Sequence, residues 1–275
     1  MTFHRPRAIF NENNLCVLDI ETICGEEMGD GSFPPWCLHT PVAACLLTAV
    51  RDTHGEWAFD LENVRFSDPE EALYRIDDLL RGASCITFNG RGFDLPVLIL
   101  TAQKVRVFEL PALIAAANEP RYWSAKHYDL TDKVSGYGAA RGASLERLCG
   151  ALGIPIKQSA HGGDVGAMYD RGDIAGIERY CASDVAGTLL AYAYQRAMET
   201  GDPGYHASLT WQFARWCEQQ FLDHLAPYAE VRDRQMLQQL SLLGQLDGSL
   251  ENARLNADLR EKQAMDASFG EVIHY

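Results

Sequence analysis

The stretch Leu15-Cys16-Val17-Leu18-Asp19-Ile20-Glu21 begins as a continuous apolar run and ends in two carboxylates separated by one residue. An apolar run without polar alternation is typical of a strand buried on both faces, so we expect a central strand at Leu15–Ile20. Side chains alternate along a strand, which puts Asp19 and Glu21 on one side and Ile20 in the core. Such close like charges repel, and a cation or a shared proton relieves the repulsion; a structural or solvated acidic pair is the alternative.

The segments around this strand predict an α/β fold with a mixed sheet flanked by helices. Further strands are expected at Pro41–Val50, Glu56–Leu61, Ser84–Phe88 and Val105–Leu110, with a turn at Asp52–Gly55. Helices are expected from Ser67-Asp68-Pro69-Glu70 to about Arg81 and over Phe93–Gln103, Ser144–Leu152 and Asp173–Thr200. The glycine- and proline-rich stretches Thr22–Thr40 and Lys157–Gly172 are predicted to be loops.

Gly201-Asp202-Pro203-Gly204 is the strongest candidate boundary in the chain. It predicts an α/β domain over residues 1–204 and a helical C-terminal extension over residues 205–275. Apolar residues at helical spacing between Leu209 and Phe221 predict core packing. The amphipathic, leucine-rich Val231–Leu259 could dock on the main domain, form a homo-oligomer or bind a recruiting protein.

The composition indicates a soluble cytoplasmic protein. The longest apolar run, Pro41–Val50, is well short of the roughly 20 residues of a membrane span, and Met1–Asn14 lacks a signal-peptide pattern. The eight cysteines form no CxxC pair and have no zinc-like spacing, so we expect buried, reduced thiols.

The net charge of −14 argues against binding nucleic acid through a basic surface. An acidic protein can still act on nucleic acid when divalent cations lie between its carboxylates and the phosphates. Two such ions add four positive charges and would change −14 to −10, a small global change with a large local effect. Composition alone therefore leaves the substrate class open.

A second polar segment, Phe88-Asn89-Gly90-Arg91-Gly92-Phe93-Asp94-Leu95-Pro96, joins a predicted strand to a predicted helix. Asp94 followed two residues later by proline also fits an ordinary helix start. Asn89, Gly90 and Gly92 favour a turn whose backbone approaches a ligand closely.

A third polar pair, Tyr180 and Asp184, is four residues apart in the longest predicted helix and hence on one face. Aspartate has a poor helix propensity, and this one lies among apolar residues. A buried tyrosine–aspartate pair without a ligand is the alternative reading.

Taken in order, these three segments resemble the three motifs of the DEDD exonuclease superfamily: DxE on a first strand, NxxxFD after a later strand, and YxxxD in a late helix. They are most similar to its tyrosine-bearing (DEDDy) branch and to the proofreading exonuclease domain of B-family DNA polymerases. The resemblance covers roughly Leu15 to Arg196, and no polymerase palm or fingers follow in this sequence.

The resemblance implies an RNase H-like sheet and a 3′→5′ exonuclease that releases nucleoside 5′-monophosphates. It implies two divalent ions, Mg²⁺ or Mn²⁺, bound by Asp19, Glu21, Asp94 and Asp184, with Tyr180 orienting the attacking water. The polymerase-like second motif favours a single-stranded DNA 3′ end over RNA. A non-catalytic nucleic-acid-binding relative of the fold is a further alternative.

The resemblance also suggests residues that contact the substrate. Asn89 and Phe93 match positions near the substrate strand, although Phe93 also fits a core role. Lys157 in the glycine-rich loop could contact a phosphate. Asp129, in His127-Tyr128-Asp129-Leu130, could support the site, and a structural role is the alternative.

Overall fold

The computed structural model describes residues 10–26, 29, 32–122, 125–156, 164–230 and 236–244. Their centre is a five-stranded mixed sheet of order β3-β2-β1-β4-β5. β1 (Asn14–Cys24) pairs antiparallel with β2 (His39–Arg51) and parallel with β4 (Ser84–Thr87). β3 (Trp57–Arg65) and β5 (His127–Asp129) form the edges. The predicted mixed α/β sheet is confirmed.

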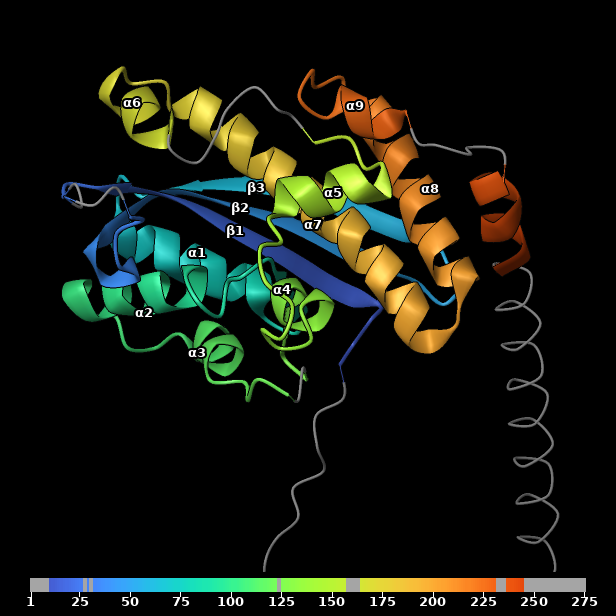
Figure 1. Ribbon diagram of the computed structural model, residues 1–275, viewed down its shortest axis with the longest axis horizontal. Coiled ribbons are helices and arrows are strands. Elements are labelled where there is room, and N and C mark those ends of the chain that lie inside the picture. Colours follow the sequence, from blue (N-terminus) through green and yellow to red (C-terminus); the bar gives the residue numbers. More distant parts are fainter. Residues whose placement is uncertain are drawn as a thin grey trace, which may run out of the picture.

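Helices cover both faces of the sheet (Figure 1). One face carries α1 (Pro69–Leu80), α2 (Asp94–Val105) and α3 (Pro111–Ala117). The other carries the long α7 (Ile174–Thr200), on which α8 (Pro203–Gln220) and the short α9 (Ala226–Ala229) lie. Three further short helices are α4 (Leu130–Val134), α5 (Leu145–Leu152) and α6 (Val165–Asp170), and residues 236–244 are also helical.

Two apolar clusters, one on each face, hold these layers together. Val17 of β1 packs with Val185 and Leu189 of α7 in one cluster. Leu18 of β1 packs with Leu73 of α1 in the other. Burying Val and Leu side chains of this kind stabilises a fold by about 1.5–3 kcal/mol each. β1 is therefore the buried centre of the molecule, as its uninterrupted apolar run predicts.

Local helix signals placed most helix ends correctly. Asp68 caps α1 by accepting hydrogen bonds from the backbone N–H groups of Glu70 and Glu71. Ser144 caps α5 and Gly153 ends it with a positive φ, the left-handed conformation that glycine tolerates. Asp173 caps α7.

Three predictions about secondary structure were wrong. Val105–Leu110 is not a strand: α2 continues to Val105, Arg106 adopts a left-handed conformation and Pro111 starts α3. Residues 165–170 form α6 instead of loop, because Val165 packs against Ile177 of α7. The expected loop Thr22–Thr40 is shorter, since β1 runs to Cys24 and β2 begins at His39. It also contains a 3-10 turn, η1 (Trp36–Leu38).

α8 starts directly after the predicted boundary, where Gly201 ends α7 and Asp202 caps α8. Leu209 and Phe213 of α8 lie in the same apolar cluster as β1 and α7, as expected for core residues. Phe221 was also predicted to pack in the core, but it follows the end of α8 in a left-handed conformation and is 92% exposed. The division at residues 204/205 stays a prediction. Among the described helices, none combines the length and apolar character that crossing a membrane requires.

Candidate metal centre

The four predicted carboxylates come from three elements that meet at β1. Asp19 and Glu21 lie on β1 itself, Asp94 is the first residue of α2, and Asp184 lies in α7. The charges of Asp94, Glu21 and Asp184 raise the pKa of Asp19, and those of Asp184 and Asp94 raise the pKa of Glu21. The fold therefore brings together groups that are far apart in the sequence.

Asp19 and Glu21 lie on the α7 side of the sheet, while Ile20 between them packs into the opposite apolar cluster. This is the alternation that the strand predicts. Glu21 is only 7% exposed. Burial, followed by the charges of Asp184 and Asp94, raises the pKa of Glu21 well above its ordinary value. The pKa of Asp19 is raised for the same reasons, with burial as the largest cause.

Asp94 is tied directly to β1. Its Oδ1 atom accepts a hydrogen bond from the backbone N–H of Ile20 at 3.0 Å. Burial raises the pKa of the Asp94 carboxyl to about 7, although hydrogen bonds from its own N–H and from that of Ile20 lower it. Asp94 thus does more than start a helix, because it links the second motif to the first.

Tyr180 and Asp184 lie one turn apart on α7 and interact through their side chains. A hydrogen bond from Tyr180 lowers the pKa of Asp184, but burial outweighs it and raises that pKa to about 7. Burial and then the charge of Asp184 raise the pKa of Tyr180. Tyr180 therefore remains a neutral phenol and can donate a hydrogen bond in the centre of the cluster.

The cluster carries more negative charge than its surroundings compensate. Among the described residues, no lysine or arginine forms an ion pair with any of the four carboxylates. The raised pKa values are the consequence of this uncompensated charge, since burial and like charges both disfavour the ionised form of a carboxyl group. A divalent cation removes that penalty, and carboxylate oxygens are the hard ligands that Mg²⁺, Mn²⁺ and Ca²⁺ prefer. The donor set fits such ions.

Cys181 is a member of the cluster that the sequence analysis missed. Its Sγ atom lies 3.3 Å from Oδ2 of Asp19, and ligand atoms of Asp19, Glu21 and Cys181 all lie within 4.8 Å of one another. A signal was available: Cys181 precedes Asp184 by three residues, a spacing that shares a helix face. We instead interpreted it as one of several small apolar residues.

Asp129 organises the loop that leads to Asp94. Its two carboxylate oxygens accept hydrogen bonds from the backbone N–H groups of Asn89, Arg91 and Thr131 at 2.9–3.0 Å. Asn89 adopts φ 65°, which an asparagine tolerates better than most residues. Asp129 thus has the structural role, and through it supports the loop that holds Asn89.

Gly90 is required for packing within this loop. A Cβ atom at Gly90 would lie 2.5 Å from the side chain of Thr87. Thr87 Oγ1 also accepts a hydrogen bond from the Gly90 N–H at 3.1 Å, and it pairs with His127 Nε2 at 2.8 Å. The loop therefore rests closely on the end of β4.

Phe93 lies in an aromatic group beside the carboxylates. Its ring centroid is 4.9 Å from that of His39 and 5.6 Å from that of Phe33. Phe93 is half-buried, whereas Phe33 is 72% exposed. Sequence analysis missed Phe33 because its proximity to Phe93 arises only in the folded chain. Lys157, predicted to contact a phosphate, lies outside the described residues.

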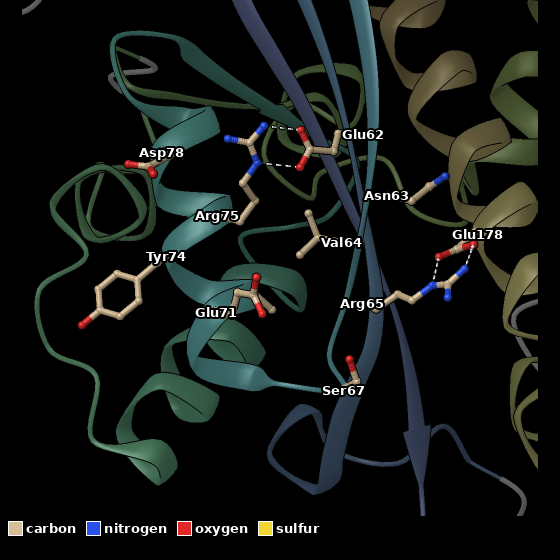
Figure 2. A pocket seen from close by; sticks show the side chains of 11 residues that line it. Glu62, Asn63, Val64, Arg65, Ser67, Glu71, Tyr74, Arg75, Asp78 and Glu178 are labelled. Atoms are coloured by element: carbon tan, nitrogen blue, oxygen red, sulfur yellow. Dashed lines mark hydrogen bonds and ion pairs between the residues drawn. The ribbon is translucent and has the colours of Figure 1, made fainter.

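A hollow of about 870 Å³ lies elsewhere on the described surface, along β3 and α1 (Figure 2). Its two arginines are each paired with a glutamate. Arg65 Nε lies 2.6 Å from Glu178 Oε1, and Arg75 Nε lies 2.6 Å from Glu62 Oε1. These charges are compensated, in contrast to those of the four carboxylates.

Comparison with known proteins places the chain in a family. A sequence model described as "predicted 3′-5′ exonuclease related to the exonuclease domain of PolB" matches residues 31–230. This range includes Asp94, Tyr180 and Asp184, whereas Asp19 and Glu21 precede it. No curated protein matches the sequence.

Two solved structures are similar to this chain. The family B DNA polymerase from the hyperthermophilic archaeon Pyrobaculum calidifontis shares 16% identity at a TM-score of 0.48. The match covers 80% of this chain and 28% of the polymerase. An ExoI/SSB-Ct complex shares 14% identity at a TM-score of 0.43, over 78% of this chain and 46% of that one. The chain thus spans less than half the length of either.

The family model covers well over half of the sequence and runs from the loop before β2 to the end of α9. The chain therefore belongs to the family of predicted 3′-5′ exonucleases related to the exonuclease domain of PolB.

Proposed function

We propose that this exonuclease removes nucleoside 5′-monophosphates from single-stranded DNA 3′ ends by two-metal-ion hydrolysis. Asp19, Glu21, Asp94 and Asp184 hold the ions, and Tyr180 orients the attacking water. The observation that carries the proposal is the convergence of four uncompensated carboxylates, whose pKa values are all raised above their ordinary range.

Divalent ions at such a site supply Lewis-acid activation of water and compensation of the charge on the leaving oxygen. The protein holds the carboxylates ready in position. The hydrogen bond from Ile20 N–H fixes the orientation of Asp94, which reduces the rearrangement needed when an ion binds. Tyr180, a neutral phenol beside Asp184, offers a hydrogen bond that holds the water in line with the scissile phosphate.

Two features support a single-stranded end as the substrate. Phe93 directly precedes Asp94, and its half-buried ring contacts the exposed ring of Phe33, so the two rings offer stacking surfaces that suit any base. The chain is acidic overall, so a long basic groove for duplex DNA is not expected from its net charge of −14. Asn89, held by Asp129, is the proposed polar contact to the strand.

The acidic surface also favours delivery of the substrate by a recruiting partner, with the C-terminal helices as the proposed contact. Every cysteine in the described residues is free, which supports the proposed cytoplasmic location.

A polarity assay on matched DNA and RNA oligonucleotides, labelled at the 5′ end, tests the proposal. With Mn²⁺ or Mg²⁺ we expect a ladder of products shortened from the 3′ end, and mononucleotides as the released product. EDTA and Asp19→Ala should abolish the ladder. Full activity in EDTA, or internal cuts when the 3′ end is blocked, would contradict the mechanism. Faster digestion of the RNA strand would assign the same chemistry to RNA.

A further inference from the structure

The thiol of Cys181 lies within the carboxylate cluster. Its Sγ atom is 3.3 Å from Oδ2 and 3.4 Å from the backbone oxygen of Asp19. Cys181 is fully buried on α7, between the helix and β1. An oxygen-only site for Mg²⁺ or Mn²⁺ needs no sulfur ligand. The S–H group is placed to donate a hydrogen bond to Asp19, and the proposed reaction assigns the sulfur no further role.

The spacing of the ligand atoms suits a softer ion with tetrahedral coordination. Zinc takes sulfur at about 2.3 Å and carboxylate oxygen at about 2.0–2.2 Å in a tetrahedral arrangement, which separates neighbouring ligand atoms by roughly 3.5 Å. The Sγ–Oδ2 distance of 3.3 Å between Cys181 and Asp19 already has this value. The ligand oxygen of Glu21 lies within 4.8 Å of both atoms, so it needs to move by only about 1 Å.

Glu21 gives an independent indication that this pocket of side chains takes a ligand. It is 7% exposed, and within the described residues its carboxylate has neither a hydrogen bond nor an ion pair. A buried carboxylate without a partner is unfavourable, and a coordinated cation removes this penalty. One carboxylate oxygen of Glu21 lies within 4.8 Å of the ligand atoms of Asp19 and Cys181, so one ion can reach all three side chains.

We propose that Asp19, Glu21 and Cys181 form a site for a thiophilic divalent cation of the zinc and cadmium class. When the ion binds, a metal–sulfur bond forms, the S–H bond breaks and the proton leaves to solvent, without any change of oxidation state. Because Asp19 and Glu21 would also hold the catalytic ions, this inference rests on the proposed function. Zn²⁺ then competes with Mg²⁺ or Mn²⁺ and inhibits the nuclease.

Cobalt(II) is a probe that reports the sulfur ligand directly. In the metal-free full-length protein, Co²⁺ bound to Cys181 gives a thiolate-to-cobalt charge-transfer band in the near ultraviolet. We expect one equivalent of Co²⁺ to produce this band and Zn²⁺ to abolish it by displacement. The band should be lost in Cys181→Ala and in Cys181→Ser, which keeps a hydrogen-bond donor beside Asp19.

Two other buried thiols provide matched controls. Cys217 lies on α8 and is 2% exposed, so Cys217→Ala should keep the band. Cys45 pairs with Asp19 across the strands and lies beside the thiol of Cys181. Loss of the band in Cys45→Ala, with retention in Cys181→Ala, would assign the sulfur ligand to Cys45 and overturn the proposal. Retention of Mn²⁺ binding in Cys181→Ala, measured by calorimetry, shows that this variant is folded.

Inhibition provides the second measurement. In the Mn²⁺-supported assay, Cys181→Ala should raise the Zn²⁺ concentration for half-inhibition at least tenfold, while Cys217→Ala should leave it unchanged. Mn²⁺-dependent activity with no cobalt band in the wild-type protein would overturn this inference and leave the nuclease intact. A cobalt band without nuclease activity under any metal would have the opposite meaning. It would support the thiophilic site and contradict the proposed reaction.

Discussion

Asp94 Oδ1 accepts a hydrogen bond from the backbone N–H of Ile20, the residue between Asp19 and Glu21. This bond connects the start of α2 to β1 at the point where the carboxylates of β1 lie. The Asp94 carboxylate is also buried, and the charges of neighbouring carboxylates disfavour its ionised form. One residue therefore aligns the site while disfavouring its own ionised form.

Asp94→Asn separates these two roles, because asparagine keeps the oxygen that accepts from Ile20 but removes the charge. We expect nuclease activity to fall by more than the roughly 10–100-fold that loss of an outer-shell metal partner costs. The melting temperature of the metal-free protein should stay equal or rise, since repulsion is relieved. Kinetics and thermal unfolding check the two outcomes, and activity within tenfold of wild type would exclude Asp94 as a ligand.

Tyr180→Phe removes only the hydroxyl that interacts with Asp184. We expect kcat to fall by about 100-fold, the lower range for loss of a positioned proton donor or acceptor, with Mn²⁺ affinity unchanged. Tyr128→Phe is the matched control. The Tyr128 hydroxyl also donates a hydrogen bond to a carboxylate, that of Glu199 at 2.8 Å, which is not one of the four carboxylates of the cluster. An equal loss of activity in both variants would point to a general structural effect.

Asp129→Ala leaves three backbone N–H groups around the Asn89–Arg91 loop without their acceptor. Each unsatisfied buried group costs about 1–3 kcal/mol, so we expect the free energy of unfolding to fall by about 2–4 kcal/mol, with part of the cost relieved by water. Urea unfolding measures this. Asp52→Ala, which removes an acceptor of two N–H groups in an exposed turn, should cost less than half as much.

The stability of the metal-free protein should depend on pH because of Asp94 and Asp184. Their pKa values, about 7 when folded, exceed the ordinary value of 3.8, so the folded state binds more protons across that interval. The stabilisation of the folded state by these bound protons is fully present below pH 3.8 and is lost as the pH rises through about 7. We expect the melting temperature to fall between about pH 4 and pH 7, and less so in Asp94→Asn.

A buried histidine acts in the opposite direction. Burial lowers the pKa of His127 from 6.5 to about 3, so its contribution is present above pH 6.5 and is lost as the pH falls. Comparing wild type with Asp94→Asn at each pH cancels this effect. Identical pH profiles of the two proteins would show that Asp94 has an ordinary pKa.

Phe33→Ala should weaken binding of single-stranded DNA without affecting the fold, because the side chain is 72% exposed. Loss of one base-stacking contact costs about 1–3 kcal/mol, which corresponds to a rise in KM of roughly 5- to 150-fold. Phe108→Ala, at a phenylalanine that is 69% exposed between α2 and α3, is the control and should leave KM unchanged. Equal KM values for the two variants would remove Phe33 from the substrate site.

Local signals in the sequence predicted a large part of the fold. The two ends of α7 were predicted correctly from Asp173 and Gly201, because a capping side chain and a left-handed glycine act within one turn of the helix. The prediction of a strand at Val105–Leu110 was wrong, because packing overrides the strand propensity of its β-branched and aromatic residues. In the structure, Val107 and Leu110 instead reach the core from an irregular connection.

The carboxylates were predictable as a set, while their neighbours were not. Asp19, Glu21, Asp94 and Asp184 stand in motifs whose order along the chain indicates one site. Cys181 and Phe33 carry no such pattern: one resembles an ordinary core thiol and the other lies in a loop rich in glycine and proline. Their roles depend on contacts between segments that only the folded chain brings together.

The span of the cluster also bears on how the protein is made in the cell. Asp19 and Cys181 lie 162 positions apart, and Asp184 follows on the same helix. A ribosome therefore has to release most of the chain, and α7 has to dock on β1, before all four carboxylates meet. Incomplete products of translation that end before α7 contain the first motifs but cannot assemble the centre. On the proposed function, a chain that ends before α7 therefore has no nuclease activity.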